Sequence, residues 1–101
     1  MNLKDYGKYV EKRNGSIYYY CHGKLHRTDG PAVELSNGTK AWYFEGKLHR
    51  TDGPAREFVG GRKEWYFEGK LHRTDGPARE YANGYKEYWE HSSFIKSTYG
   101  I

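Results

Sequence analysis

The chain has 101 residues, which predicts a single domain (1–101), and a net charge of +4. Because 17 basic residues are interleaved with 13 acidic ones, the composition indicates a mixed surface with a mild basic bias and excludes a polycationic tail. One cysteine, Cys21, excludes an intramolecular disulfide and favours a reducing compartment. We also expect no signal peptide and no membrane span, because no segment has the apolar length that either requires.

The most regular feature of the chain is a repeat with a period of 23 residues. The ten residues GKLHRTDGPA recur unchanged at Gly23–Ala32, Gly46–Ala55 and Gly69–Ala78. Such a period predicts a stack of small structural units, with atypical copies at the ends that act as caps. The predicted units are a degenerate N-terminal cap repeat (1–22), three repeats (23–45, 46–68 and 69–91) and a C-terminal cap (92–101).

Within each unit, three turn signals separate short segments. In the first full copy they are Asp29–Pro31, Asn37-Gly38 and Glu45-Gly46, of which Asn-Gly is the strongest short hairpin signal. Between them, Ala32–Ser36 and Thr39–Phe44 are rich in aromatic and branched residues and too short for helices. The pattern therefore predicts an all-β protein with two antiparallel strands per unit.

Two segments complete the predicted chain. A brief extended piece is expected at Lys24–Arg27, whereas the tail from residue 92 fits either a strand or a short helix. With eleven Tyr, three Trp and four Phe, the core should consist mainly of rings, and the leucines Leu25, Leu48 and Leu71 should join it. Rings on the other face of the strand are either covered by extended segments or exposed as a stripe for a partner or a homodimer.

The residues WYFEGKLHRTDGPA, followed by NG and a K-x-W-Y strand, resemble the MORN-variant repeat of phage, giant-virus and bacterial proteins over about Gly7 to Glu90. That variant typically reads W-Y-x-N-G-K-x-H-R-x-D-G-P-A. Glu45 and Glu68 stand where the family usually has Asn, which disfavours a type I′ turn there. The resemblance implies a meander of antiparallel β-hairpins in an elongated curved sheet. It also implies a scaffold for protein binding, with some relatives linked to phospholipid surfaces or to antitoxins.

The repeated His-Arg-Thr-Asp element is the clearest candidate for chemistry. Equivalent residues of successive units lie about two strand spacings, roughly 10 Å, apart. They cannot share one metal ion, whose ligands lie at about 2 Å. We therefore predict no metal and no cofactor, and expect Asp to cap the turn amides while Arg or His pairs with it. The structural turn residues are His26, Asp29, His49, Asp52, His72 and Asp75.

Catalysis is not expected, because no nucleophile, base and orienting group converge in the sequence. Cys21 and His22 are adjacent, and on a strand they point to opposite faces. A ladder of repeated Arg and Lys with neighbouring rings gives nucleic-acid binding as an alternative, although glutamates recurring at the same period weaken its field.

We predict a non-enzymatic protein-binding repeat module that acts in the cytoplasm. In its specific form it is a small phage-encoded inhibitor of a host or defence-system protein, in the host cytoplasm. Nucleic-acid binding and a structural homo-oligomer or homodimer are the alternatives. The candidate partner-binding residues are Tyr43, Tyr66, Trp89, Arg56, Arg79, Arg27, Arg50 and Arg73.

Overall fold

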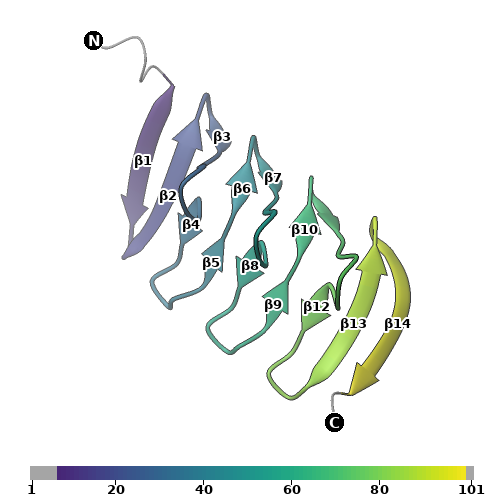
Figure 1. Ribbon diagram of the computed structural model, residues 1–101. Helices are drawn as coiled ribbons and strands as arrows, with labels where there is room; N and C mark the ends of the chain where they lie inside the picture. Colours follow the sequence, from purple (N-terminus) through teal and green to yellow (C-terminus); the bar gives the residue numbers. More distant parts are fainter. Residues whose placement is uncertain (1–6, 100–101) are drawn as a thin grey trace.

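The computed structural model describes residues 7–99, and it confirms the predicted all-β fold (Figure 1). An open antiparallel sheet of ten strands runs the length of the elongated molecule, and two separate two-stranded hairpins, β6-β7 and β10-β11, lie beside it. The strands are β1 (Lys8–Arg13), β2 (Ser16–Cys21), β3 (Lys24–Leu25), β4 (Val33–Glu34), β5 (Lys40–Ala41), β6 (Tyr43–Phe44), β7 (Lys47–Leu48), β8 (Arg56–Glu57), β9 (Lys63–Glu64), β10 (Tyr66–Phe67), β11 (Lys70–Leu71), β12 (Arg79–Glu80), β13 (Tyr85–Glu90) and β14 (Ser93–Tyr99).

In the internal units the predicted strand Thr39–Phe44 is divided at Trp42. Residues before it form β5 in the main sheet, and residues after it form β6, which pairs with β7. The backbone N–H of Trp42 donates to the Ala55 carbonyl at 2.7 Å, while its own carbonyl accepts from His49 N–H at 3.0 Å. Trp42 therefore joins the sheet to the hairpin, and the extended piece predicted at Lys24–Arg27 is the equivalent second strand of such a hairpin.

At the two ends of the molecule the same segments form long, uninterrupted strands. β2 pairs with β1 along its whole length and also with β3 and β4. β13 pairs with β12 and with β14, with a register shift at Tyr88/Trp89. The tail that fitted either a strand or a helix is thus the strand β14.

The tight turns differ from the sequence expectation. Glu45 and Gly46 have φ values of 49° and 83°, the two positive angles that a type I′ turn requires, so the prediction against this turn is wrong. Both of its amides are bound by residues at the end of the preceding hairpin: Glu45 N–H donates to His26 Nδ1 at 2.9 Å, and Gly46 N–H donates to the Leu25 carbonyl at 2.8 Å. These bonds hold a glutamate in a conformation that Asn or Gly adopts more readily.

The Asn-Gly signal, by contrast, forms a longer loop. Gly38 N–H donates to the Leu35 carbonyl at 2.9 Å, and Leu35 N–H donates to the Thr39 carbonyl at 2.8 Å. Only Gly38 has a positive φ in this loop, 96°. This pattern is a three-residue hairpin built on a type I turn followed by a left-handed glycine.

The buried centre of the protein is made of small residues rather than rings. Ala32, Ala55 and Ala78, the last residues of the repeated decapeptide, are completely inaccessible to solvent. The rings of the strands are half-buried or exposed, so the expected aromatic core is wrong. One sheet crossed by single segments is too thin to enclose a ring, whereas an alanine methyl fits where a segment and the sheet meet through hydrogen bonds.

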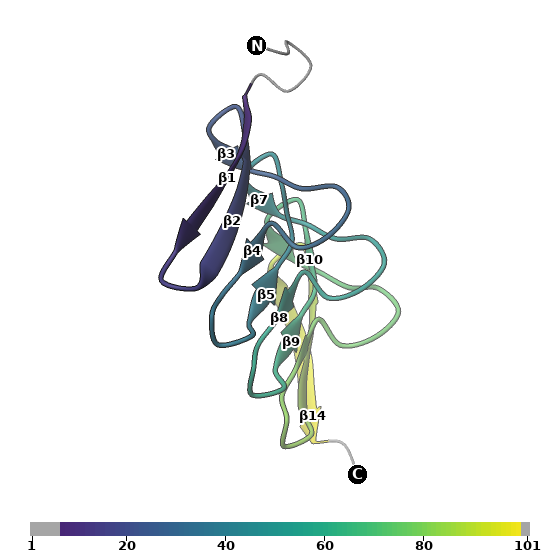
Figure 2. The same ribbon diagram turned by 90° about the vertical axis from the view of Figure 1, so that its left-hand side faces the viewer.

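Figure 2 shows that the segments between the hairpins and the sheet project as three stacked loops on one side of the molecule. We call them the crossing loops; they comprise residues 26–32, 49–55 and 72–78. Each contains Asp-Gly-Pro, and its arginine folds back over the glycine. A Cβ at Gly76 would lie 2.8 Å from Cζ of Arg73, so a larger residue would displace the guanidinium.

Candidate functional site

The arginine of each crossing loop stacks on a ring of the sheet. Its guanidinium carbon lies over the ring at about van der Waals distance from the centroid, which is a cation–π arrangement. Lys96 stands 23 residues after Arg73 and lies over Tyr88 at 4.8 Å, so the period continues into the C-terminal strand. The arginine pairs are Arg27 on Tyr19 (3.9 Å), Arg50 on Trp42 (3.8 Å) and Arg73 on Trp65 (4.0 Å).

Each of these arginines is also bonded to carboxylates of its own unit. Arg50 Nε donates to Asp52 at 2.9 Å, and its Nη1 donates to the Pro54 carbonyl at 3.0 Å and to Glu57 at 3.2 Å. The other two loops repeat the arrangement, and the arginine side chains are only 22–23% exposed. The structure therefore places Arg27, Arg50 and Arg73 inside the chain's own network rather than in a ladder of free cations.

Among the charged residues of the crossing loops, the exposed ones are the aspartates. Asp29 is 82% exposed, yet its hydrogen bond and ion pair with Arg27 hold the pKa of its carboxyl below the ordinary value. Sequence reasoning paired Asp with either Arg or His, and the structure pairs it with Arg. A second cluster of charges lies in the main sheet.

Arg56 and Arg79, both predicted to bind a partner, surround the buried carboxylate of Glu64. Glu64 is 2% exposed; Arg79 Nε donates to it at 2.9 Å and Arg56 Nη1 at 3.4 Å. Arg62 Nε is 3.4 Å away without hydrogen-bond geometry. Burial lowers the pKa of Arg79, but the charge of Glu64 together with Tyr81 and Glu87 outweighs it, and the pKa is raised.

Two more predicted partner residues join this cluster. The Tyr66 hydroxyl donates to Glu64 at 3.3 Å, and Trp89 Nε1 donates to Glu87 at 3.0 Å, which also accepts from Arg79 at 2.9 Å. Sequence reasoning missed Glu64 and Glu87. The available signal was that both replace Ala41 at the same repeat position, where Arg56 and Arg79 replace Val33 opposite it. Tyr43, by contrast, is half-buried opposite Leu48.

The histidines bond to the tight turn of the next hairpin rather than to their own loop. His26, His49 and His72 accept through Nδ1 from the backbone N–H of the residue 19 positions ahead, at 2.9–3.0 Å. An accepting Nδ1 in a neutral imidazole means that the ring proton is on Nε2. Each histidine therefore fixes the tight turn that follows it, a long-range contact that spacing within one element does not show.

These tight turns form a row along one long edge of the molecule (Figure 1). Half-buried histidines alternate there with phenylalanines in a continuous ring stripe: His26–Phe44 and His49–Phe67 have centroid distances of 4.6 Å, and Phe44–His49 has 6.1 Å. Phe44 is 44% and Phe67 43% exposed. We call the exposed side chains at this edge the turn ridge: Lys24, Phe44, Glu45, Lys47, Phe67, Glu68, Lys70 and Glu90.

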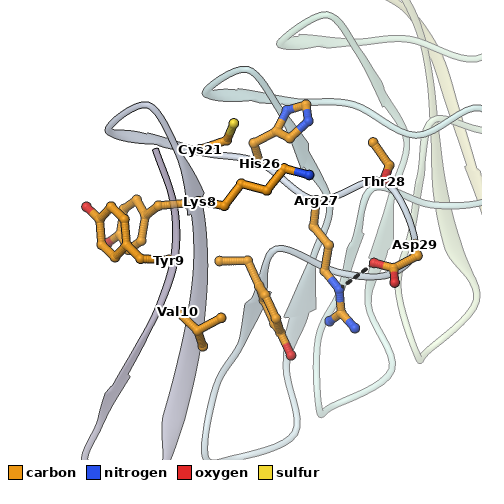
Figure 3. Close-up of a pocket in the computed structure, with 10 residues that line it drawn as sticks. Lys8, Tyr9, Val10, Cys21, His26, Arg27, Thr28 and Asp29 are labelled. Atoms are coloured by element: carbon orange, nitrogen blue, oxygen red, sulfur yellow. Dashed lines mark hydrogen bonds and ion pairs between the residues drawn. The ribbon is translucent and has the colours of Figure 1, made fainter. Parts of the chain in front are cut away.

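Shallow depressions lie on both sides of the hairpins. One of about 430 Å³ on the turn ridge is lined by Lys24, Phe44, Glu45, Lys47, His49 and Glu68. Two of about 610 and 670 Å³ lie between neighbouring crossing loops. Another of about 530 Å³ lies between the strands β1 and β2 and the first crossing loop, and Figure 3 shows the bonded pair Arg27–Asp29 on its wall. Within residues 7–99, no group of three or more His, Cys, Asp or Glu is arranged to hold a metal ion.

Comparisons of the chain with protein-family models, with curated proteins and with solved structures find no match. The fold and the period of 23 residues still define a class, the β-hairpin repeat proteins. In the part of the chain that the structure describes, no helix has the length and apolar character to cross a membrane.

Proposed function

We propose that the chain is a non-enzymatic protein-binding repeat module whose contact surface is the turn ridge. The distribution of ion pairs carries this proposal. Within the described residues, nine carboxylates pair with an arginine, and those without such a pair are Glu45, Glu68 and Glu90. All three stand on the turn ridge. The carboxylates of this edge are thus free to meet a partner, while those of the sheet and the crossing loops are already paired with arginines.

The shape and composition of the turn ridge support a protein partner. Two half-exposed phenylalanines lie between exposed lysines and glutamates, which resembles the apolar centre and polar rim of a protein–protein interface. The row of turns is long and only shallowly hollowed, and such surfaces suit another macromolecule better than a small ligand. The resemblance to MORN-variant repeats points to the same kind of function.

The more specific form of this proposal is a small phage-encoded inhibitor of a host or defence-system protein, active in the host cytoplasm. It follows from the resemblance and from the small size of the module. Nucleic-acid binding through Arg27, Arg50 and Arg73 is a weaker alternative, because each of these guanidinium groups bonds two carboxylates of its own unit.

The proposal is tested by affinity capture from nuclease-treated host lysate. The double variant Phe44→Ser/Phe67→Ser should lose the proteins that the native chain captures, because it removes the apolar centre of the turn ridge. The control Val59→Ser changes a residue that is 66% exposed in a loop of the main sheet, and it should retain them. Equal capture by both variants, with both still folded, contradicts a site on the turn ridge.

A further inference from the structure

We propose that the turn ridge binds the turn ridge of a second copy of this chain, running antiparallel about a two-fold axis. This inference rests on the proposed function, because it names the partner of the same surface. Its basis is the order of the charges. From one end of the turn ridge to the other, the charged residues are Lys24, Glu45, Lys47, Glu68, Lys70 and Glu90, so that positive and negative groups alternate.

The order of these charges in space follows their order in the chain. The side chain of Lys24 extends over the next turn, since a Cβ at Gly46 would lie 3.6 Å from it. Lys47 extends over Gly69 in the same way, at 3.7 Å. Lys24 and Lys47 therefore lie beside the turns of Glu45 and Glu68. The four turns succeed one another in a single row (Figure 1).

This series begins with a positive group and ends with a negative one. A copy turned by a two-fold axis between Lys47 and Glu68 therefore presents the opposite charge at every position. Glu45 then faces Lys70 of the copy, and Lys47 faces its Glu68. Because the axis is two-fold, each contact occurs twice, as in any isologous interface. A parallel copy in the same register would instead set like charges against each other.

The spacing of the turn ridge also selects a second copy. Its charges recur with the structural repeat, so a partner must carry groups at the same interval to meet several of them at once. A second molecule of this chain has the same spacing between its charged groups, because it has the same repeat. The same rotation brings Phe67 opposite Phe67 of the copy, which places apolar rings in the centre between the ion pairs.

None of the six charged groups forms an ion pair with another described residue, so pairing between copies breaks no contact within the chain. The surface is narrow and its ion pairs are exposed to solvent, which weakens each of them. We therefore expect a dimer with a dissociation constant in the micromolar range, sensitive to salt.

The test uses two charge-reversed variants. Glu45→Lys/Glu68→Lys makes the centre of the turn ridge positive throughout, and Lys47→Glu/Lys70→Glu makes it negative. Sedimentation velocity of the native chain across a concentration series up to about 100 μM should show a dimer, and each variant alone should be monomeric. An equimolar mixture of the two variants should dimerise again, at least tenfold more tightly than either alone, because each then meets its opposite.

The control is Lys8→Glu/Lys12→Glu in β1, where both lysines are exposed. It changes the net charge by the same amount as Lys47→Glu/Lys70→Glu and should leave the dimer intact. Thermal melts of all variants separate lost association from lost folding. A native chain that stays monomeric, a dimer that persists in both reversed variants, or a mixture that stays monomeric overturns the second-copy partner. If Phe44→Ser/Phe67→Ser still abolishes capture in that case, the turn ridge remains a binding site for a different protein.

Discussion

The sheet side and the turn ridge use the same kinds of residue in opposite ways. In the sheet and the crossing loops, guanidinium groups are folded onto rings and bonded to carboxylates, and Glu64 is 2% exposed among three arginines. On the turn ridge, lysines and glutamates are exposed and unpaired within the described chain. Repetition alone does not reveal which residues are free. Arg56 and Glu64, at positions that vary between copies, lie in the ion-pair cluster of the sheet, whereas Lys47 of the constant segment is exposed on the turn ridge.

The largest effect should come from the interior charge cluster. Glu64→Ala leaves Arg56, Arg62 and Arg79 around an uncompensated site and should cost about 3 kcal/mol of unfolding free energy in urea titrations. The double variant Arg56→Val/Glu64→Ala recreates the Val33–Ala41 pair of the preceding unit and should be more stable than Glu64→Ala. A double variant less stable than the single one would falsify the idea that the charges compensate each other.

An intermediate effect should come from His49, which links the two regions. His49→Ala removes the acceptor of the Glu68 amide and should lower the unfolding free energy by about 1 kcal/mol. Because the bond holds one turn, hydrogen exchange of the Glu68 amide should accelerate well before exchange in the sheet. Uniform acceleration at all amides would instead show that the histidine stabilises the whole fold and not its turn.

The smallest effect concerns the exposed aspartate of the first crossing loop. The pKa of Asp29 is lowered in the folded chain, chiefly by its hydrogen bond with Arg27. Its contribution to stability is therefore present above the unfolded pKa, about 3.9, and is lost as the pH falls through the lower folded value. The melting temperature of Asp29→Asn should lie slightly below that of the native chain at pH 6 and converge with it in acid. Parallel curves down to pH 2 would contradict this role.

The sequence predicted the fold class because the period and the turn signals are local and repeated. It did not predict which turn is tight, because the amides of the Glu-Gly turn are bound by Leu25 and His26 of the preceding hairpin. It misplaced the interior because Tyr, Trp and Phe were assigned to the core from their residue type alone. Rings are the usual core residues, yet in a sheet this thin the buried positions fall to Ala32, Ala55 and Ala78.

The candidate site was predicted least well. Arg56 and Arg79 were predicted to bind a partner, but where they replace Val33 of the first copy, Glu64 and Glu87 replace Ala41 opposite it. Arg79 reaches Glu64 across 15 residues of sequence, which requires knowledge of the register. Phe44 and Phe67 were treated as strand rings, although each directly precedes a turn and therefore lies at the edge of the fold.

The buried carboxylate of Glu64 has a consequence for how the chain finds its native pairing. Identical decapeptides invite a slip by one whole unit, because most backbone contacts would form equally well after it. Such a slip would pair Glu64 with Val33 instead of Arg56. The buried carboxylate would then have neither water nor the arginine as a partner. The varied pair thus distinguishes the first copy from the other two, and a chain mispaired between them is disfavoured by the charge that it would bury.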